Sequence, residues 1–482
     1  MASEAVTPPL IATVICVVGI LGLLVLDRDP DHRTSHALWI AVIWMLLSGS
    51  RPISQWLQVP DPSIDQNLEG NALERSVFSV FLLAGLVVLF MRGRTASMLS
   101  LMNWPLLLFI FYCGISVLWS EYPGVAFRRW IKALGDPVMI MIILTDPDRL
   151  SAVKRFVART SFVFMPISIL FIKYYPALGL RFNITDGGRG FVGVATDKNM
   201  LGAICLFSGL GAVWRIRHWL LEKPHACGSR PLIAQGVILS MVVWLLWNAN
   251  SMTSIGGLAI GSGLIVATSF PGFTQRRTLV HGMVVAAIAA ACVPLFLDAA
   301  GGVLTAVGRD PTLTQRTELW GDVVVLNPSP LVGAGFESFW LGSRLTTLWA
   351  KYQWRPNESH NGYLEVFLNL GWVGVAMLAV VVVVGYRKAI QMVRLDPELG
   401  GFKVACVVVG IIYSLTEAGF RMMHPMWIST MLAVFVVPNP VLRISSAKDP
   451  ATAAPAAPAA PARWPRPAHA LRFAQPSSKW QR

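Results

Sequence analysis

Residues 374–385 read GVAMLAVVVVVG, and every position between the two glycines is apolar. A strand of a membrane barrel would instead alternate apolar and polar side chains over about ten residues. A segment that is apolar on every face is typical of a helix in the hydrocarbon layer, where backbone groups must find their hydrogen bonds within the protein. Residues 374–385 therefore predict a transmembrane helix.

Comparable apolar runs recur from residue 8 to residue 438, and most approach the ~20 residues that a helix needs to cross a ~30 Å hydrocarbon core. The pattern predicts an all-α polytopic membrane helix bundle of about twelve spanning helices. The candidate spans lie near 8–26, 37–49, 76–91, 104–118, 127–145, 156–175, 199–214, 231–248, 254–270, 279–298, 361–386, 402–418 and 425–438. The first run lacks a cleavage site and predicts a retained helix rather than a signal peptide.

The composition excludes an ordinary soluble enzyme. Of the 482 residues, 54% are hydrophobic and only 14% are charged, against about 25% charged residues in a typical soluble domain. The net charge of +14 lies mostly in short loops between predicted helices, so it indicates membrane topology rather than nucleic-acid binding. The six cysteines show no CxxC pair and no zinc spacing, so we expect neither a disulfide framework nor a metal site.

The distribution of Lys and Arg predicts which loops share a side of the membrane. Loops 146–155, 215–230, 271–278 and 387–403 hold 13 basic residues in 51 positions. The alternating loops 176–198, 249–253, 299–360 and 419–424 hold 9 in 96 positions. By the positive-inside rule, the first set is cytoplasmic and the second faces outward, to the periplasm.

The 62-residue loop 299–360 is expected to be a structured periplasmic element within a transmembrane domain of residues 1–445, because it carries seven aromatic residues. Thr312 and Gln315 resemble a capping box, and Asn327-Pro328-Ser329-Pro330 would end the helix that follows. Arg316, Trp320 and Val323/Val324 would share one face of that helix. Residues 446–482 are rich in Ala and Pro with six basic residues and one acidic residue, which predicts a disordered cytoplasmic tail.

Known catalytic motifs give little guidance. Residues 188–193 match GxGxxG, but no strand precedes them and a membrane helix follows, which argues against a dinucleotide site. The sequence contains no Walker lysine loop, HExxH motif or nucleophile elbow.

The remaining candidates are polar residues predicted to face outward. Two interpretations stay open for them: an anion site, since guanidinium groups pair bidentately with phosphate oxygens, or a ring of arginines that contacts lipid headgroups. The set comprises Arg128, Arg129, Lys132, Arg181, Arg189, Asp197, Lys198, Asn199, Arg309, Arg316, Glu318, His360, Glu365, Glu417, Arg421 and His424.

His360 is the sharpest candidate, because it would end the long loop at the membrane surface, where an imidazole could take a proton from an incoming hydroxyl. A lone interfacial histidine can equally be structural. Glu417 and Arg421, four residues apart, would form an ion pair at a helix end. Asp136-Pro137 would mark a helix kink.

Two stretches around His360 carry a family resemblance. SHNGYLEVFLNLGWVG (359–374), preceded by GRDPTLTQRTELWGDVVVLNPSPLVGAGFESF (308–339), resembles the signature region of the O-antigen ligase and polymerase superfamily, with His360 and Gly371 in its H-x10-G spacing. WSEYPGVAFRRWIKALGDPVM (119–139), FIKYYPALG (171–179) and TDKNMLGAICL (196–206) are similar to its exopolysaccharide-polymerase branch, typified by ExoQ.

The resemblance implies a metal-independent glycosyltransferase without a cofactor in the bacterial inner (cytoplasmic) membrane. Its donor would be a glycan on undecaprenyl diphosphate, at the periplasmic face. The acceptor would be another lipid-linked repeat for an exopolysaccharide or O-antigen polymerase, which we favour slightly, or lipid A-core of lipopolysaccharide for an O-antigen ligase. Membrane lipids and a chain-length regulator are the further expected partners, and nucleic acid is not.

The resemblance also implies roles for individual residues. His360 would be the general base and Arg316 the second catalytic residue. Arg316 and Arg309 would contact the diphosphate or order the loop, and Arg189 with Lys198 would complete the anion pocket. The other substrate-binding candidates are Arg309, Arg189, Lys198, Arg128, Arg129, Glu318, Glu365 and Trp320. The alternative functions are a glycolipid or polysaccharide transporter or flippase, for which an inverted repeat is expected but not evident, and a non-catalytic scaffold.

Overall fold

The computed structural model describes residues 9–29, 32–58, 71–182, 189–222, 228–270, 272, 276–299 and 312–435. Arg309 and the predicted tail 446–482 lie outside these residues, as do the side chains of Thr312 and Gln315.

The described residues are overwhelmingly helical. The helices are α1 (Pro9–Leu26), α2 (Leu38–Ser48), α3 (Ile53–Trp56), α5 (Ala72–Met102), α6 (Trp104–Ile115), the 3-10 turn η1 (Ser116–Trp119), α7 (Pro123–Ala133), α8 (Gly135–Leu144), α9 (Arg149–Tyr174), α10 (Pro176–Gly179), α11 (Lys198–Glu222), α12 (Arg230–Ala249), α13 (Met252–Ala267), α15 (Arg277–Ala299), α16 (Thr312–Val325), α17 (Gly342–Lys351), α18 (Gly362–Leu395), α19 (Pro397–Tyr413) and α20 (Pro425–Val434). The strands β1 (Leu180–Phe182) and β2 (Arg189–Phe191) pair antiparallel.

The prediction of an all-α membrane protein is confirmed. Six helices among the described residues are long and apolar enough to cross a membrane: α1, α5, α9, α11, α12 and α18. Each predicted span contains helix, although several of these helices are shorter than a full crossing. A total of about twelve spans therefore stays a prediction.

Two of the predicted helix boundaries are wrong. The single span 127–145 is divided at Leu134 into α7, which carries Arg128, Arg129 and Lys132, and the apolar α8. The helix predicted over 402–418 ends at Tyr413, and the carbonyl of Ser414 instead accepts a hydrogen bond from the backbone of Gly362 at 2.8 Å.

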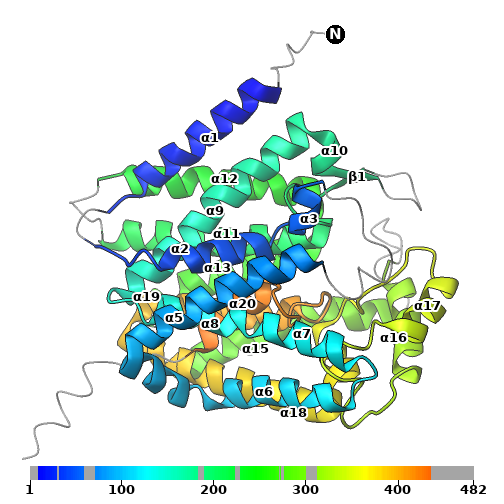
Figure 1. Cartoon of the computed structure of the whole chain (residues 1–482). Coiled ribbons are helices and arrows are strands. Elements are labelled where there is room, and N and C mark those ends of the chain that lie inside the picture. The colour runs from blue at the N-terminus through cyan, green and yellow to red at the C-terminus, as the bar shows by residue number, and fades with distance from the viewer. Residues whose placement is uncertain are drawn as a thin grey trace, which may run out of the picture. The chain divides into compact units, whose positions relative to one another are not determined.

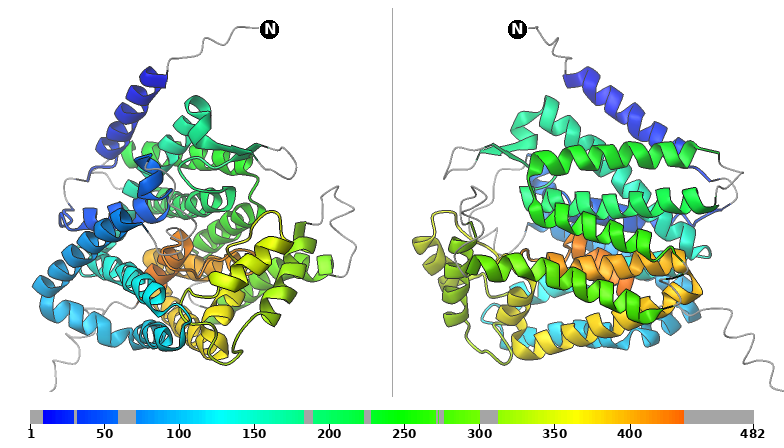
Figure 2. Two further views of the ribbon diagram at one scale, coloured as in Figure 1. Left: turned by 45° about the vertical axis from the view of Figure 1, so that its right-hand side comes forward. Right: turned by 180° about the vertical axis from the view of Figure 1, so that it is seen from behind.

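Most of the helices run side by side (Figures 1 and 2). Helix α11 packs against α9, α12 and α13, while α19 packs against α13, α18 and α20. The core between them consists of fully buried apolar side chains such as Trp44, Phe162, Phe207 and Val408. Aromatic stacking adds to this packing, since the rings of Trp214 and Phe402 lie 4.3 Å apart.

Contacts among the described residues join segments within each of the two groups of loops that the charge pattern predicts. In the first group, Lys154 of α9 forms an ion pair with Glu398 of α19. In the second, Thr253 of α13 shares a hydrogen bond with Thr416, and Asn199 of α11 contacts Glu417. Helices α16 and α17 lie with the second group at one end of the bundle (Figure 2). That this end faces the periplasm stays a prediction.

Candidate functional site

The backbone around His360 is fixed from both sides. The side chain of Asn361 accepts hydrogen bonds from the backbone of Tyr363 and Leu364, which caps α18, and it donates to the carbonyl of Leu415. The backbone of Ser359 donates to the carboxylate of Glu365. His360 itself has a φ of 51°, a left-handed conformation that non-glycine residues rarely adopt. The histidine is therefore held in a strained position at the start of α18.

Two carboxylates flank the His360 ring. Its Nδ1 lies 3.0 Å from a carboxylate oxygen of Glu358 and 3.2 Å from one of Glu417. Burial by itself would lower the pKa of His360, but hydrogen bonds to both carboxylates, together with their charges, raise this pKa to about 10. The same contact, with help from Arg421, outweighs burial and lowers the pKa of Glu358 to about 2. At neutral pH His360 is therefore protonated as an imidazolium, and its Nδ1–H donates to the carboxylates of Glu358 and Glu417.

Glu417 joins three segments of the chain at this histidine. One of its oxygens lies 3.2 Å from a guanidinium nitrogen of Arg316 on α16, and the other accepts from the side chain of Asn199 at 3.0 Å. Arg316 also donates to the carbonyl of Thr416 at 2.6 Å. Glu417 is only 5% exposed, so these partners compensate a carboxylate that is almost fully out of water.

Arg421 continues the alternation of charges. Its guanidinium lies 3.2 Å from Glu358 and 3.3 Å from Glu337. Positive and negative groups thus alternate from α16 to the 326–341 segment. We call this group the His360 cluster; its members are Arg316, Glu417, His360, Glu358, Arg421 and Glu337.

A glycine break in α18 places Glu337. Gly371 has a φ of 63°, and a Cβ on it would lie 2.2 Å from the backbone of Leu331. The break leaves the carbonyls of Leu368 and Asn369 free to accept hydrogen bonds from Ala334 and Gly335 at 2.9 Å. His360 and Gly371, the two residues of the H-x10-G spacing, therefore both position the His360 cluster. Helix α18 begins beside His360, and its break at Gly371 holds the segment that carries Glu337.

Aromatic side chains support the cluster. Trp320 of α16 donates its indole N–H to the carbonyl of Ser359 at 2.7 Å. The rings of Trp354 and His360 lie 5.9 Å apart. The indole of Trp340 donates to Glu365, and this carboxylate also holds Ser359. Trp320 and Glu365 are thus placed as supports of the His360 backbone.

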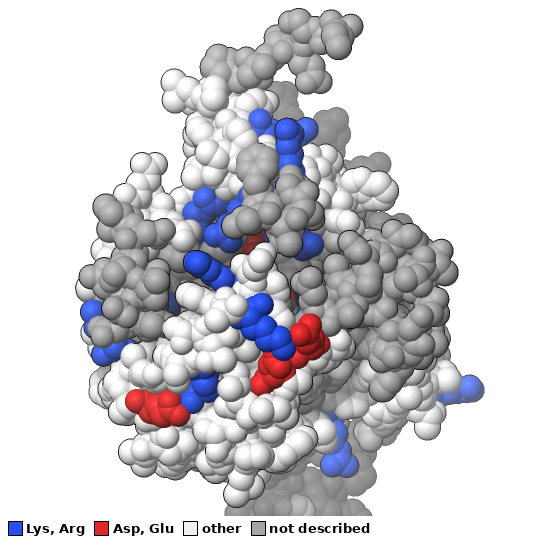
Figure 3. Space-filling view, turned by 90° about the vertical axis from the view of Figure 1, so that its right-hand side faces the viewer, with Lys and Arg blue, Asp and Glu red and all other residues white. Residues whose placement is uncertain are grey.

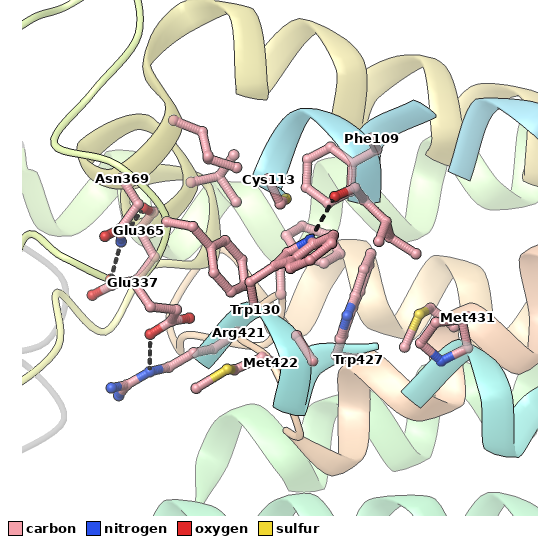
Figure 4. A pocket seen from close by; sticks show the side chains of 17 residues that line it. Phe109, Cys113, Trp130, Glu337, Glu365, Asn369, Arg421, Met422, Trp427 and Met431 are labelled. Carbon is pink, nitrogen blue, oxygen red and sulfur yellow. Dashed lines mark hydrogen bonds and ion pairs between the residues drawn. The ribbon is translucent and has the colours of Figure 1, made fainter. Parts of the chain in front are cut away.

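A small cavity of about 50 Å³ adjoins the cluster. Helices α6, α7, α8, α18 and α20 line it, and most of its lining is apolar. Arg421 and Glu337 lie at one end, whereas Phe109, Trp427 and Met431 lie at the other (Figure 4). The site therefore combines charged groups with an apolar space between helices, an arrangement suited to an amphipathic ligand.

Two cations near this cavity have no carboxylate partner in the described part of the chain. Arg129 of α7 donates to the backbone carbonyl of Glu337, and Arg128 has a buried Nε without a hydrogen-bond partner. Basic and acidic side chains lie next to one another on the face of the molecule that includes this end of the bundle (Figure 3).

The structure brings together some of the predicted site residues and separates others. His360 and Arg316 meet through Glu417. Lys198 is exposed at the start of α11, where its neighbour Asn199 reaches Glu417. Arg181 and Arg189 are exposed on the β1–β2 hairpin.

The remaining predicted groups make other contacts. Glu318 is exposed on α16 and pairs with Lys351 at 3.0 Å. His424 caps α20 by accepting from the backbone of Met426. Arg309 lies outside the described residues.

The expected ion pair between Glu417 and Arg421 is wrong. Because α19 ends at Tyr413, these residues lie in turns rather than on one helical face, and each pairs with other partners. The sequence reasoning also missed Glu358 and Glu337. Glu358 stands two residues before His360, a local signal that could have suggested it, whereas no local pattern indicates Glu337.

One group of side chains in the described residues has the geometry to hold a metal ion. Glu358, His360 and Glu417 each offer one ligand atom, and these atoms lie within 4.8 Å of one another. A metal would require Nδ1 of His360 without its proton, whereas the two carboxylates stabilise the protonated ring.

The sequence is 26% identical over 318 residues to the exopolysaccharide production protein ExoQ of Rhizobium meliloti. The chain is similar to ExoQ. The similarity covers 64% of this chain and 69% of ExoQ, and it confirms the predicted resemblance to the ExoQ-like branch of the O-antigen ligase and polymerase superfamily. No protein-family model matches the sequence. Together with the long apolar helices, the ExoQ similarity identifies a multi-pass membrane protein.

Proposed function

We propose that this protein is a membrane glycosyltransferase that moves a glycan from a lipid diphosphate, undecaprenyl diphosphate, to a sugar hydroxyl at the periplasmic face of the bacterial inner membrane. The observation that carries the proposal is the position of His360. Its ring is held by Glu358 and Glu417, next to two arginines and an apolar cavity. A proton-transfer group, anion-binding groups and an apolar surface for a lipid chain are what this reaction needs.

His360 is the proposed general base. With Nδ1 donating to the carboxylates, Nε2 is the atom that would take the proton of the acceptor hydroxyl as its oxygen bonds to the anomeric carbon of the donor. The bond from that carbon to the diphosphate breaks, and the leaving diphosphate carries away the electron pair. Because the pKa of His360 is about 10, only about one molecule in a thousand has the neutral ring at pH 7. The rate should therefore rise with pH.

Arginines are proposed to stabilise the leaving diphosphate. Arg316 and Arg421 are both occupied by carboxylates in the His360 cluster, whereas Arg128 and Arg129 have no ion pair in the described residues. A diphosphate at the polar end of the cavity would compete with Glu337 for Arg421 and gain Arg129 beside it. Charge developing on the leaving group would then be compensated by fixed guanidinium groups.

The cavity supports a lipid-linked substrate. Its apolar end lies between helices α6, α7 and α20, next to Phe336, Phe420 and Met422 of the connecting segments. An isoprenoid chain that enters between these helices would lie against this apolar lining while its diphosphate stays beside the arginines. A soluble nucleotide sugar would leave this apolar space unused.

A polymerase is favoured over an O-antigen ligase, because the relative with the matching sequence is a protein of exopolysaccharide production. In the proposed reaction the acceptor is then a second lipid-linked repeat, and a chain-length regulator is the expected partner. With lipid A-core as the acceptor, the same site would act as a ligase. The bundle of residues 1–445, with the 299–360 segment as its periplasmic element, would form the enzyme.

The proposal is tested by the glycans of a strain that lacks this protein, complemented with the wild type or with His360→Ala. Carrier-linked, lipopolysaccharide-linked and secreted glycans are resolved by size. Single repeats that accumulate on the carrier indicate a polymerase, and long carrier-linked chains beside bare lipid A-core indicate a ligase. Full rescue by His360→Ala, at equal protein level, would contradict the role of His360.

Two further results would replace the proposal. Glycan that accumulates on the cytoplasmic side of the membrane would indicate a transporter or flippase instead. Loss of activity in a chelator, with recovery on adding one divalent cation, would contradict the proposed metal independence and point to the Glu358, His360 and Glu417 group as a metal site.

A further inference from the structure

Asp136 is a fully buried carboxylate whose two oxygens have separate partners. It is 1% exposed and lies in the first turn of α8, between apolar helices. One oxygen accepts from the indole N–H of Trp44 on α2 at 2.9 Å, and the other accepts from the backbone N–H of Met423 at 2.8 Å. No ion pair to Asp136 is found in the part of the chain that the structure describes. The charge of Lys132, at the end of α7, also acts on this carboxylate. A buried carboxylate without an ion pair is costly even so, which indicates a role beyond packing.

The contact with Met423 holds the segment that carries Glu417 and Arg421. This segment, residues 414–424, joins α19 to α20, and its near end is tied to the start of α18 by the bond from Gly362 to the carbonyl of Ser414. Asp136 ties its far end, two residues after Arg421. Met423 has a φ of 58°, so its backbone is held in a strained conformation where the carboxylate meets it.

The other partner of Asp136 fixes the carboxylate itself. Trp44 is buried against the backbone of Gly135, where a Cβ would lie 2.0 Å from its ring. The indole therefore packs directly on the turn that begins α8 and donates to Asp136 from there. The carboxylate is held in a rigid helix pair on one side and presents its second oxygen to the 414–424 segment on the other.

We propose that Asp136 is a positioning residue: through Met423 it sets Arg421 against Glu337 and Glu358, and so the charge around His360. This inference rests on the proposed function for its effect on catalysis. Its structural part, that Asp136 holds the 414–424 segment, does not depend on that function.

The test compares Asp136→Ala with Trp44→Phe in the purified full-length protein. Alanine removes both acceptor oxygens, so the backbone of Met423 loses its acceptor. Phenylalanine removes the Trp44 N–H but leaves Asp136 free to hold Met423. Both variants therefore remove the hydrogen bond between Trp44 and Asp136, and only Asp136→Ala also releases the segment.

Hydrogen exchange supplies the readout that is independent of activity. The Met423 amide should be protected in the wild type and in Trp44→Phe, and it should exchange at least ~10-fold faster in Asp136→Ala. An unprotected Met423 amide in the wild type would overturn the proposal even if Asp136→Ala does not fold. Equal exchange in the two variants would overturn it as well.

Glycan transfer supplies the second readout. Asp136→Ala should lower turnover per folded molecule by about 10-fold, and Trp44→Phe by less than about 2-fold. Because Arg421 would move away from Glu358, the pKa of His360 should rise, and the acidic limb of the pH–rate profile should move to higher pH in Asp136→Ala alone. Faster exchange of the Met423 amide without a change in turnover or in the pH–rate profile would overturn the catalytic part of the proposal, because transfer would then not depend on how the 414–424 segment is held. A wild type without transfer activity would refute the proposed function, while the exchange result would still decide the role of Asp136.

Discussion

Two carboxylates, the partly buried Glu398 and the buried Glu417, organise the charges at opposite ends of the bundle. Glu398 pairs with Lys154 at 2.7 Å and with Nδ1 of His218 at 3.0 Å. Glu417 pairs with Arg316 and with Nδ1 of His360, both at 3.2 Å. Each carboxylate thus holds one long cationic side chain and one histidine, so the two sites differ little in their chemical groups.

Their backbones differ strongly. Lys154, His218 and Glu398 all lie within helices, on α9, α11 and α19. Three non-glycine residues with positive φ belong to the His360 cluster or adjoin it: Glu337, His360 and Met423. His360 also meets a second carboxylate, Glu358. Strained backbone at one of two similar clusters is the mark of a site where geometry is held for chemistry rather than for helix packing.

The largest effect should separate the two carboxylates. Glu417→Ala should lower transfer by about 1,000-fold, because it removes the group that holds His360 and Arg316 and leaves a buried guanidinium without its partner. Glu398→Ala should reduce the amount of folded protein but leave turnover per folded molecule within about 3-fold. Glycan transfer normalised to folded protein checks both. Equal losses of turnover would remove the functional distinction between the two ends.

The next effect concerns the arginines. Arg421→Ala should lower transfer by about 100-fold, because Arg421 stands at the polar end of the cavity where the diphosphate is proposed to leave. Arg215 on α11, which pairs with Asp27 at 2.6 Å, is the matched control, and Arg215→Ala should change turnover by less than about 3-fold. The measurement is kcat/KM for a lipid-linked donor. A loss on Arg215→Ala as large as that on Arg421→Ala would contradict the assignment.

A smaller effect tests the charge around His360 by pH. Glu358 raises the pKa of His360, so Glu358→Gln should lower it, and the neutral base should then appear at lower pH. The acidic limb of the pH–rate profile should shift to lower pH by at least about 1 unit. A rate that falls as pH rises through this range, in the wild type, would show that His360 acts as a cation toward the diphosphate and not as a base.

The smallest effect concerns Glu318, which the sequence placed among the substrate-binding residues. It is exposed and pairs with Lys351 on the outer side of α16. Glu318→Gln should change transfer by less than about 2-fold, since exposed ion pairs contribute little. A loss of 10-fold or more would mean that substrate extends over α16 and Lys351.

The sequence predicted the helices well because apolar runs are a local property. The positions of the helices, the helix over Thr312–Val325 and the grouping of loops at two ends all follow from hydropathy, turn residues and the positive-inside bias. The break at Leu134 lies just before Asp136-Pro137, where the sequence indicated a kink within one span, and there the composition changes from the basic α7 to the apolar α8.

The site could be predicted only in part. His360 and Arg316 were recognised through a family pattern, and the structure joins them through Glu417. The partners of Arg421 come from residues 337 and 358, far from it in the chain, so helical spacing favoured the wrong partner. The role of Gly371 also depends on distant backbone, at Leu331, which no spacing reveals.

Transfer by purified protein measures the central claim most directly. The wild type, His360→Ala and His218→Ala are each supplied with lipid-linked repeat units, in detergent and with chelator present, and the glycan products are resolved by length. The account predicts elongated lipid-linked glycan and released lipid diphosphate from the wild type and from His218→Ala, and no detectable product from His360→Ala at equal folded protein. Equal product from His360→Ala and the wild type would contradict the claim that the His360 cluster carries out the reaction.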